Sequence, residues 1–169
     1  MKKTVLFSLV ILLIAVLAVM SSTPGAAKAS KITTCALQTN TAEIPGKIWF
    51  SDDGTIMHIR GQITYADITP LAGHPECDPV YSRGQMEMEV NINLNLVTGE
   101  GNAYGKHTIT ADGFHGAWVG THRGKIENFV YSGKAVSYGT GELEGMLQKV
   151  NIVQAGETTY ETYGFVLIP

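Results

Sequence analysis

The sequence is poor in several features that would indicate a particular chemistry. It has two cysteines, and no Cys/His pair has the spacing of zinc ligands. The Asp-rich turns lack the ligand spacing of an EF-hand, and no serine stands in the Gly-x-Ser-x-Gly context of a nucleophile elbow. These absences argue against a zinc site, a calcium site and a hydrolase triad, so neither a metal nor a cofactor is predicted.

The N-terminus has the composition of a secretory signal peptide. Two lysines precede an apolar run at 5–20, and small residues follow it. Ala27 and Ala29 fit a signal-peptidase site, so we expect cleavage after Ala29, export of the protein and a mature single domain at 30–169. An uncleaved membrane anchor is the alternative interpretation, although the apolar run is slightly short for a span.

Basic residues are scarce in the predicted mature chain. Cleavage would remove three of the twelve basic residues and none of the fifteen acidic ones, which leaves nine against fifteen and a net charge of −6. A nucleic acid or an anionic membrane surface is a poor partner for such a protein. No stable membrane span is expected after cleavage.

The two cysteines, Cys35 and Cys77, stand in a chain with an export signal, and a disulfide between them is the expected state. Such a bond would close a loop of about 40 residues and would contribute roughly 4 kcal/mol in the chain-entropy model. Two free or reactive thiols are the competing interpretation. The bond would tie an N-terminal strand to a proline-rich loop predicted at 67–80.

The clearest pattern in the chain lies at 85–97, which reads QMEMEVNINLNLV. Every second residue from Met86 to Leu96 is apolar, and the residues between them are Glu or Asn. Strand side chains alternate between two faces, so this pattern predicts a strand with one dry and one solvated face. We interpret the Glu and Asn row as the solvated outside. The strand would span about 43 Å, which favours a steeply tilted barrel strand.

Turn signals at intervals of roughly eight to twelve residues divide the rest of the mature chain into further strands, and no segment there has a helical period. The fold class is therefore all-β, an antiparallel eight-stranded barrel, or one of eight to nine strands, closed or nearly closed. The other predicted strands are 32–40, 47–51, 55–65, 102–110, 114–126, 128–138, 146–153 and 158–168.

The C-terminal half carries a resemblance to a known superfamily. Its GTGELEGM stretch at 139–146, followed by a strand at 160–168, resembles the Gly-x-Gly-x-[Phe/Leu]-x-Gly turn and closing strand of allene oxide cyclase and dirigent barrels. The resemblance implies an eight-stranded barrel with an apolar central cavity, often assembled as a homotrimer. The family's acidic and tyrosine functional residues do not map onto this chain, so no catalytic residue is carried over.

Candidate ligand contacts follow from the strand patterns. Met86 and Met88 lie on the apolar face at 85–97, where flexible thioethers adapt to an apolar guest. Trp118 is an aromatic candidate for a cavity or for the core. His58 and Arg60 project to one side of their strand and would hold an anion if that side faced a cavity.

The residues next to His58 and Arg60 in the sequence favour a position on the exterior of the barrel for both side chains. In the strand at 55–65, a regular period would put the apolar residues on the core face, with the polar residues, Gln62 and Thr64 included, opposite them. The apolar set is Met57, Ile59, Ile63 and Tyr65.

These observations lead to three hypotheses about function. The first is an exported barrel that binds a small apolar or amphipathic molecule in its lumen. The second is an isomerase or cyclase of the allene oxide cyclase or dirigent kind, in which the barrel holds a reactive intermediate in one conformation. The third is an extracellular interaction module that uses its exterior. The absence of a catalytic constellation favours binding over catalysis.

Overall fold

A computed structural model describes residues 29–169, and the predicted signal peptide lies outside the described residues except for Ala29. The described chain forms nine strands and one short 3-10 turn, Gly141–Leu143. No helix among these residues is long and apolar enough to cross a membrane. The strands are β1 Ser30–Ile44, β2 Lys47–Phe50, β3 Ile56–Pro70, β4 Gly84–Asn95, β5 Gly101–Ala111, β6 Ala117–Glu127, β7 Val130–Gly139, β8 Leu147–Gln154 and β9 Thr159–Ile168.

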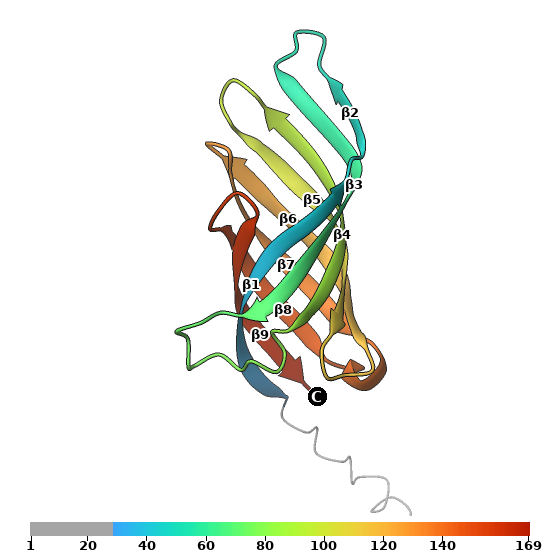
Figure 1. Ribbon diagram of the computed structural model, residues 1–169, viewed down its shortest axis with the longest axis vertical. Coiled ribbons are helices and arrows are strands. Elements are labelled where there is room, and N and C mark those ends of the chain that lie inside the picture. The colour runs from blue at the N-terminus through green and yellow to red at the C-terminus, as the bar shows by residue number, and fades with distance from the viewer. Residues whose placement is uncertain (1–28) are drawn as a thin grey trace, which may run out of the picture.

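The strands make one antiparallel sheet that closes on itself (Figure 1). From β3 to β9 each strand pairs with the next one in the sequence. β1 closes the barrel because it pairs with β9 over Ser30–Thr39 and with β3 over Ala36–Ile44. Eight strands therefore form the closed barrel, and β2, which pairs only with β3, is an extra strand at its rim. The predicted all-β barrel is confirmed.

β1 and β2 follow one path along β3, with a break at Pro45 and Gly46. Proline has no N–H for a ladder hydrogen bond, so it interrupts the strand. Gly46 lies against the backbone of β3, where a Cβ atom would stand 2.2 Å from the carbonyl oxygen of Arg60. Beyond the break, β2 and the β3 end that it pairs with rise above the rest of the barrel (Figure 1).

A β-bulge in β3 corrects the predicted faces of this strand. The register with β4 shifts between Ile59 and Gln62, and Gly61 has a φ of +66°, which glycine adopts readily. Ile59 and Gln62 consequently face the same side, opposite Ile92 and Val90 of β4. Thr64 therefore also points inward rather than outward. The predicted faces were wrong beyond this point, because the prediction assumed a period of two along the whole strand. Ile63 and Tyr65, which were predicted to face the core, point outward.

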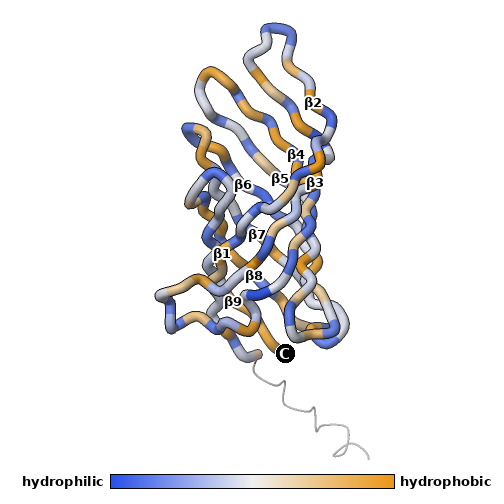
Figure 2. Tube along the Cα trace, in the orientation of Figure 1, coloured by the Kyte–Doolittle hydropathy of each residue, from blue (hydrophilic) through white to orange (hydrophobic). Residues whose placement is uncertain are grey.

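One end of the barrel is filled with apolar side chains. Trp118, Leu143 and Val166 are at most 1% exposed and form the centre of this cluster. The rings of Tyr81 and Phe114 stack at a centroid distance of 5.6 Å and pack against it. This end is therefore closed. Along several of the strands, apolar and polar residues alternate, as inward and outward faces require (Figure 2).

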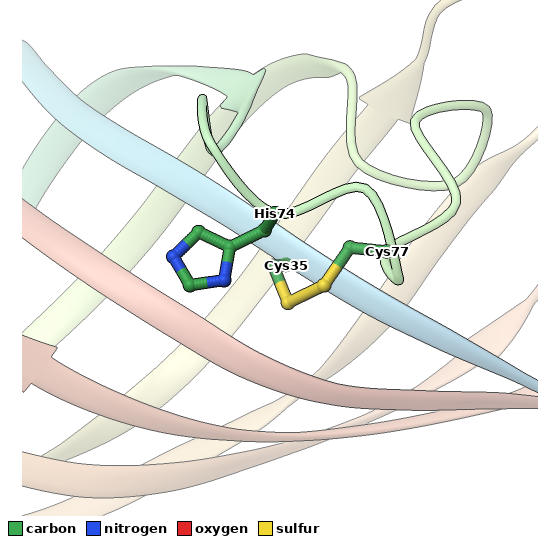
Figure 3. A group of neighbouring side chains, drawn as sticks. All are labelled: Cys35, His74 and Cys77. Atoms are coloured by element: carbon green, nitrogen blue, oxygen red, sulfur yellow. A yellow bond between two sulfur atoms is a disulfide. The ribbon is translucent and has the colours of Figure 1, made fainter.

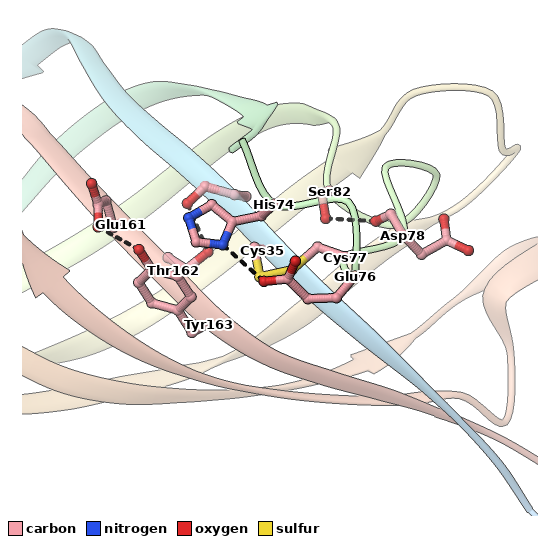
Figure 4. The surroundings of a disulfide bond; sticks show 10 residues. Cys35, His74, Glu76, Cys77, Asp78, Ser82, Glu161, Thr162 and Tyr163 are labelled. Carbon is pink, nitrogen blue, oxygen red and sulfur yellow. Dashed lines mark hydrogen bonds and ion pairs between the residues drawn. A yellow bond between two sulfur atoms is a disulfide. The ribbon is translucent and has the colours of Figure 1, made fainter. Parts of the chain in front are cut away.

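The predicted bond between Cys35 and Cys77 is confirmed (Figure 3). It joins β1 to the β3–β4 loop, which starts after Pro70, with a Cα–Cα distance of 5.5 Å. His74 lies beside the two sulfur atoms and pairs through Nδ1 with a Glu76 carboxylate oxygen at 2.9 Å (Figure 4). Because the sulfurs are bonded to one another, they are not available to a metal as thiolates.

Removal of this disulfide by Cys35→Ser with Cys77→Ser is expected to lower the free energy of unfolding by about 4 kcal/mol, because the unfolded chain regains the freedom of a long loop. The cysteines are 42 residues apart in the sequence. Urea denaturation measures the change. Reductant should shift the wild-type midpoint toward that of the variant and leave the variant unchanged. Equal midpoints for the oxidised wild type and the variant would contradict the expectation.

Candidate functional site

The barrel encloses a cavity of about 310 Å³ above the apolar cluster at its closed end. The cavity lies within the range of small-molecule sites, which are concave, mostly apolar and largely preformed. Inward-facing side chains from all eight barrel strands reach it. Its two sides differ in chemistry.

The apolar wall comes mainly from β4, because β3 turns the polar Gln62 and Thr64 into the cavity beside Met57. The inward face of β4 supplies five side chains to the cavity, and Met57 of β3 continues this wall toward the open end. Ile48 and Phe50 of β2 stand directly opposite Ile59 and Met57, so they extend the same face to the rim. The predicted dry face of the 85–97 strand thus lines a cavity. The five β4 residues are Met86, Met88, Val90, Ile92 and Leu94.

The opposite wall is mixed and comes mainly from β1 and from β5 to β9, with polar groups set among apolar side chains such as Ile109, Ile126 and Val150. It presents amides, imidazoles and hydroxyls to the cavity. Among the lining residues no Lys or Arg occurs, and Glu43, exposed near the mouth, is the single carboxylate. The side chains that carry this polarity are Gln38, Asn40, His107, His122, Tyr131, Ser137, Gln148, Gln154 and Tyr160.

Two histidines meet in this wall. His107 on β5 and His122 on β6 have ring centroids 5.9 Å apart, and both are less than 9% exposed. His107 Nε2 and Ser137 Oγ share a hydrogen bond of 2.7 Å. Burial, with a smaller contribution from His122, lowers the pKa of His107 to about 4. Burial also lowers the pKa of His122, so both rings are neutral at pH 7.

Tyr131 has a buried hydroxyl with no hydrogen-bond partner among the described residues. Its ring lies over Gly124 and Gly133, where Cβ atoms would come within 2.6 and 2.2 Å of the tyrosine. The ring of Tyr160 meets it edge-on at 6.2 Å. Burial, with a smaller effect from Tyr160, raises the pKa of Tyr131 to about 12, so the hydroxyl keeps its proton. The two glycines therefore make room for the ring of Tyr131, which lines the cavity, and its hydroxyl lies buried beside Gly133.

The structure separates the candidates predicted from the sequence. Met86 and Met88 line the cavity. Trp118 is 1% exposed and belongs to the apolar cluster that closes the barrel, so it lies below this cavity and not in its wall. His58 and Arg60 lie on the outside of β3, as their neighbours indicated, and cannot reach a guest in the lumen.

His58 and Arg60 contact other side chains on the outside of the barrel. His58 Nδ1 and an Arg60 guanidinium nitrogen both lie within 2.8 Å of the side-chain oxygen of Asn93 on β4. The Trp49 ring stacks on His58 at 5.1 Å and receives the Arg60 guanidinium at 5.4 Å. These contacts hold β2, β3 and β4 together beside the bulge.

The polar cavity residues were missed by sequence reasoning. His107 and Ser137 sit on strands that also turn small residues inward, Ala103 and Gly105 on β5 and Gly133 and Ala135 on β7, so these strands show no strong alternation of apolar and polar residues. One usable signal existed, since the strand at 102–110 places Ala103, His107 and Ile109 on one face.

Comparison with known proteins shows the fold and no more. No family model and no curated protein matches the chain. A solved structure, a protein of unknown function from the DUF3224 family of Shewanella oneidensis MR-1, is similar over 84% of this chain and 99% of its own, with 16% identity and a TM-score of 0.54. At that identity the likeness concerns the barrel alone, and the resemblance to allene oxide cyclase and dirigent proteins stays a prediction.

The buried histidines predict a loss of stability in acid. Between pH 6.5 and about 4 the unfolded chain binds a proton at His107 that the folded chain does not, so stability falls as pH falls through this window. The loss attributable to His107 is roughly 3 kcal/mol, at about 1.4 kcal/mol per pKa unit. Urea midpoints at pH 7, 5.5 and 4 measure it.

His107→Gln is the matched variant, since an amide can still bond Ser137 and carries no titrating proton. Carboxylates titrate in both proteins, so the difference between the two pH profiles isolates the histidine. Parallel profiles for the wild type and the variant would show that His107 does not carry the effect.

Proposed function

We propose that this protein binds a small, uncharged, amphipathic molecule in the lumen of its barrel. One observation carries the proposal: the cavity of about 310 Å³ has a methionine-rich aliphatic wall on β4, and neutral hydrogen-bonding groups stand among apolar side chains on the other side. An apolar body gains from contact with the first wall, and methionine adapts to different shapes. Polar groups on the guest gain hydrogen bonds from the second.

The electrostatics of the cavity favour a neutral guest. No lysine or arginine lines it, and the two histidines are uncharged at neutral pH. Glu43 at the mouth repels an incoming anion. A hydroxyl or carbonyl on the guest suits the site, because the Tyr131 hydroxyl is a buried donor without a partner. A carboxylate or phosphate would lose its hydration without a compensating cation.

An isomerase or cyclase is the second candidate, and the same polar groups favour it. A cavity that holds a reactive molecule in one conformation accelerates rearrangement through positioning, with one or two groups to move or stabilise a proton. The neutral ring of His122 and the Tyr131 hydroxyl are the available groups. Recovery of an added guest in chemically altered form would separate this candidate from simple binding.

The proposed place of action is outside the cytoplasm, after cleavage behind Ala29. Disulfides persist in oxidising compartments, so the bond between Cys35 and Cys77 supports export. A homotrimer, as implied by the superfamily resemblance, belongs to the same proposal.

A large side chain placed in the lumen should weaken binding of a small molecule there without unfolding the barrel. Met88→Trp places an indole in the cavity and is expected to weaken binding of an uncharged naphthylamine dye by roughly tenfold or more, because overpacking excludes the guest. Glu87→Trp is the matched control, since Glu87 is the exposed neighbour on the outer face of β4. Fluorescence titration measures both.

The control should bind like the wild type. If wild-type protein shows no saturable dye binding, or if the two variants lose affinity equally, the lumen is not the binding site.

Tyr131→Phe tests the polar side of the cavity. Loss of a buried hydroxyl without a partner is expected to leave stability unchanged or to raise it by up to about 1 kcal/mol. Affinity for a hydroxyl-bearing dye should fall roughly fivefold, while affinity for its fully apolar analogue should not change. Tyr138→Phe is the control, because Tyr138 lies on the same strand and is 64% exposed. A fall that is equal for both dyes would contradict a role for the hydroxyl.

A further inference from the structure

A groove crosses the outside of the barrel over β5, β6, β7 and β8, with a volume of about 710 Å³. Its floor is the backbone of four residues that pair across these strands, Ala103, Gly124, Gly133 and Ile152. Two rows of outward-pointing side chains, here called the two ranks, flank this floor. One row is Asn102, Lys125, Ser132 and Val153, and the other is Tyr104, Arg123, Lys134 and Asn151. The groove therefore runs across the strands for three inter-strand steps, roughly 14 Å.

The two ranks are rich in cations and in neutral hydrogen-bonding groups. Arg123, Lys125 and Lys134 line the groove, and no Asp or Glu lines it. All three are exposed. This is a local reversal of the charge of the predicted mature chain, in which acidic residues outnumber basic ones by fifteen to nine. The neutral groups are Asn102, Tyr104, Ser132 and Asn151.

The central cations oppose one another directly. Arg123 on β6 is the cross-strand partner of Lys134 on β7, and like charges in this position destabilise a sheet. Neither lies within 4.0 Å of a carboxylate among residues 29–169. Lys106, outside the groove, instead faces Glu89 on β4. Arg123 and Lys134 thus form an uncompensated cationic pair at the centre of the groove. A bound anion would reduce the repulsion between them.

We propose that this groove binds an acidic polysaccharide, a chain of sugar rings that carries carboxylate or sulfate groups. Arg123 and Lys134 would hold an acidic group between them through charge-assisted hydrogen bonds, and Lys125 would hold a second. Tyr104, 42% exposed and directly opposite Arg123, offers its hydroxyl to a sugar, since the Arg60 guanidinium lies over its ring at 5.8 Å. Asn151 at the other end offers an amide for hydroxyls.

The shape and the charge of the groove favour this partner over other polyanions. A lipid surface is flat, whereas these cations border a groove with a backbone floor. Nucleic acid carries a dense row of phosphates, which the acidic remainder of the protein repels. A glycan with spaced charges and many hydroxyls matches three cations interleaved with neutral donors and acceptors. The site is separate from the lumen and does not depend on the proposed function.

The experiment compares the purified wild type with Lys134→Glu and Arg83→Glu. A chondroitin sulfate fragment and an oligogalacturonate are the probes, and an uncharged oligosaccharide of equal length is the control ligand. Lys134→Glu should weaken binding of a charged glycan by at least about tenfold, because it removes a charge-assisted contact and adds repulsion. Its melting temperature should equal or exceed that of the wild type, because it places an opposite charge beside Arg123.

Arg83→Glu makes the same change in net charge in the β3–β4 loop, outside the groove, and should bind within about twofold of the wild type. Binding of either charged glycan that weakens with added salt and is lost only in Lys134→Glu supports the proposal. Three results would overturn it: no binding by the wild type, equal losses in the two variants, or tighter binding to a DNA oligonucleotide or to anionic vesicles than to both glycans.

Discussion

The closure of the sheet by β1 is the constraint on which the rest of the structure depends. β1 pairs with β9 on one side and with β3 on the other. Without it, the remaining strands would form an open sheet with two free edges and no interior. Closure turns the alternation of each strand into a lumen and an exterior. The disulfide acts at the same place, since Cys35 belongs to the closing strand and Cys77 to the loop at the filled end.

Much of this arrangement could be predicted from the sequence, because its strongest signals are local. The alternation from Met86 to Leu96 predicts the two faces of β4, and Asp-Gly or Thr-Gly turns predict the hairpins. The bulge at Gly61 could not be predicted in this way. One extra residue reverses every side chain beyond it, and only the pairing with β4 fixes its position.

The candidate site was predicted only on its apolar side, and the reason is the composition of the opposite wall. β6 and β7 turn Gly124, Gly133 and Ala135 inward, so the contrast between their two faces is weak. The polar residues that matter include His107 and Ser137, which are 30 residues apart and meet across Gly120 of β6 only once β5, β6 and β7 have paired. Trp118 could not be assigned from the sequence for a different reason. An inward apolar residue belongs either to the core or to a cavity wall, and only its depth along the barrel decides between the two.

The rim strand β2 has one further consequence, which concerns motion. It has a single neighbour, β3, so its outer edge keeps backbone N–H and C=O groups that no strand of the described chain pairs with. Segments with few contacts and exposed hydrogen bonds open at a lower free energy than the core of a domain. Amide hydrogen exchange should therefore be fastest at this rim and slowest beside Trp118. Local opening of β2 would leave the closed ladder of eight strands below it intact.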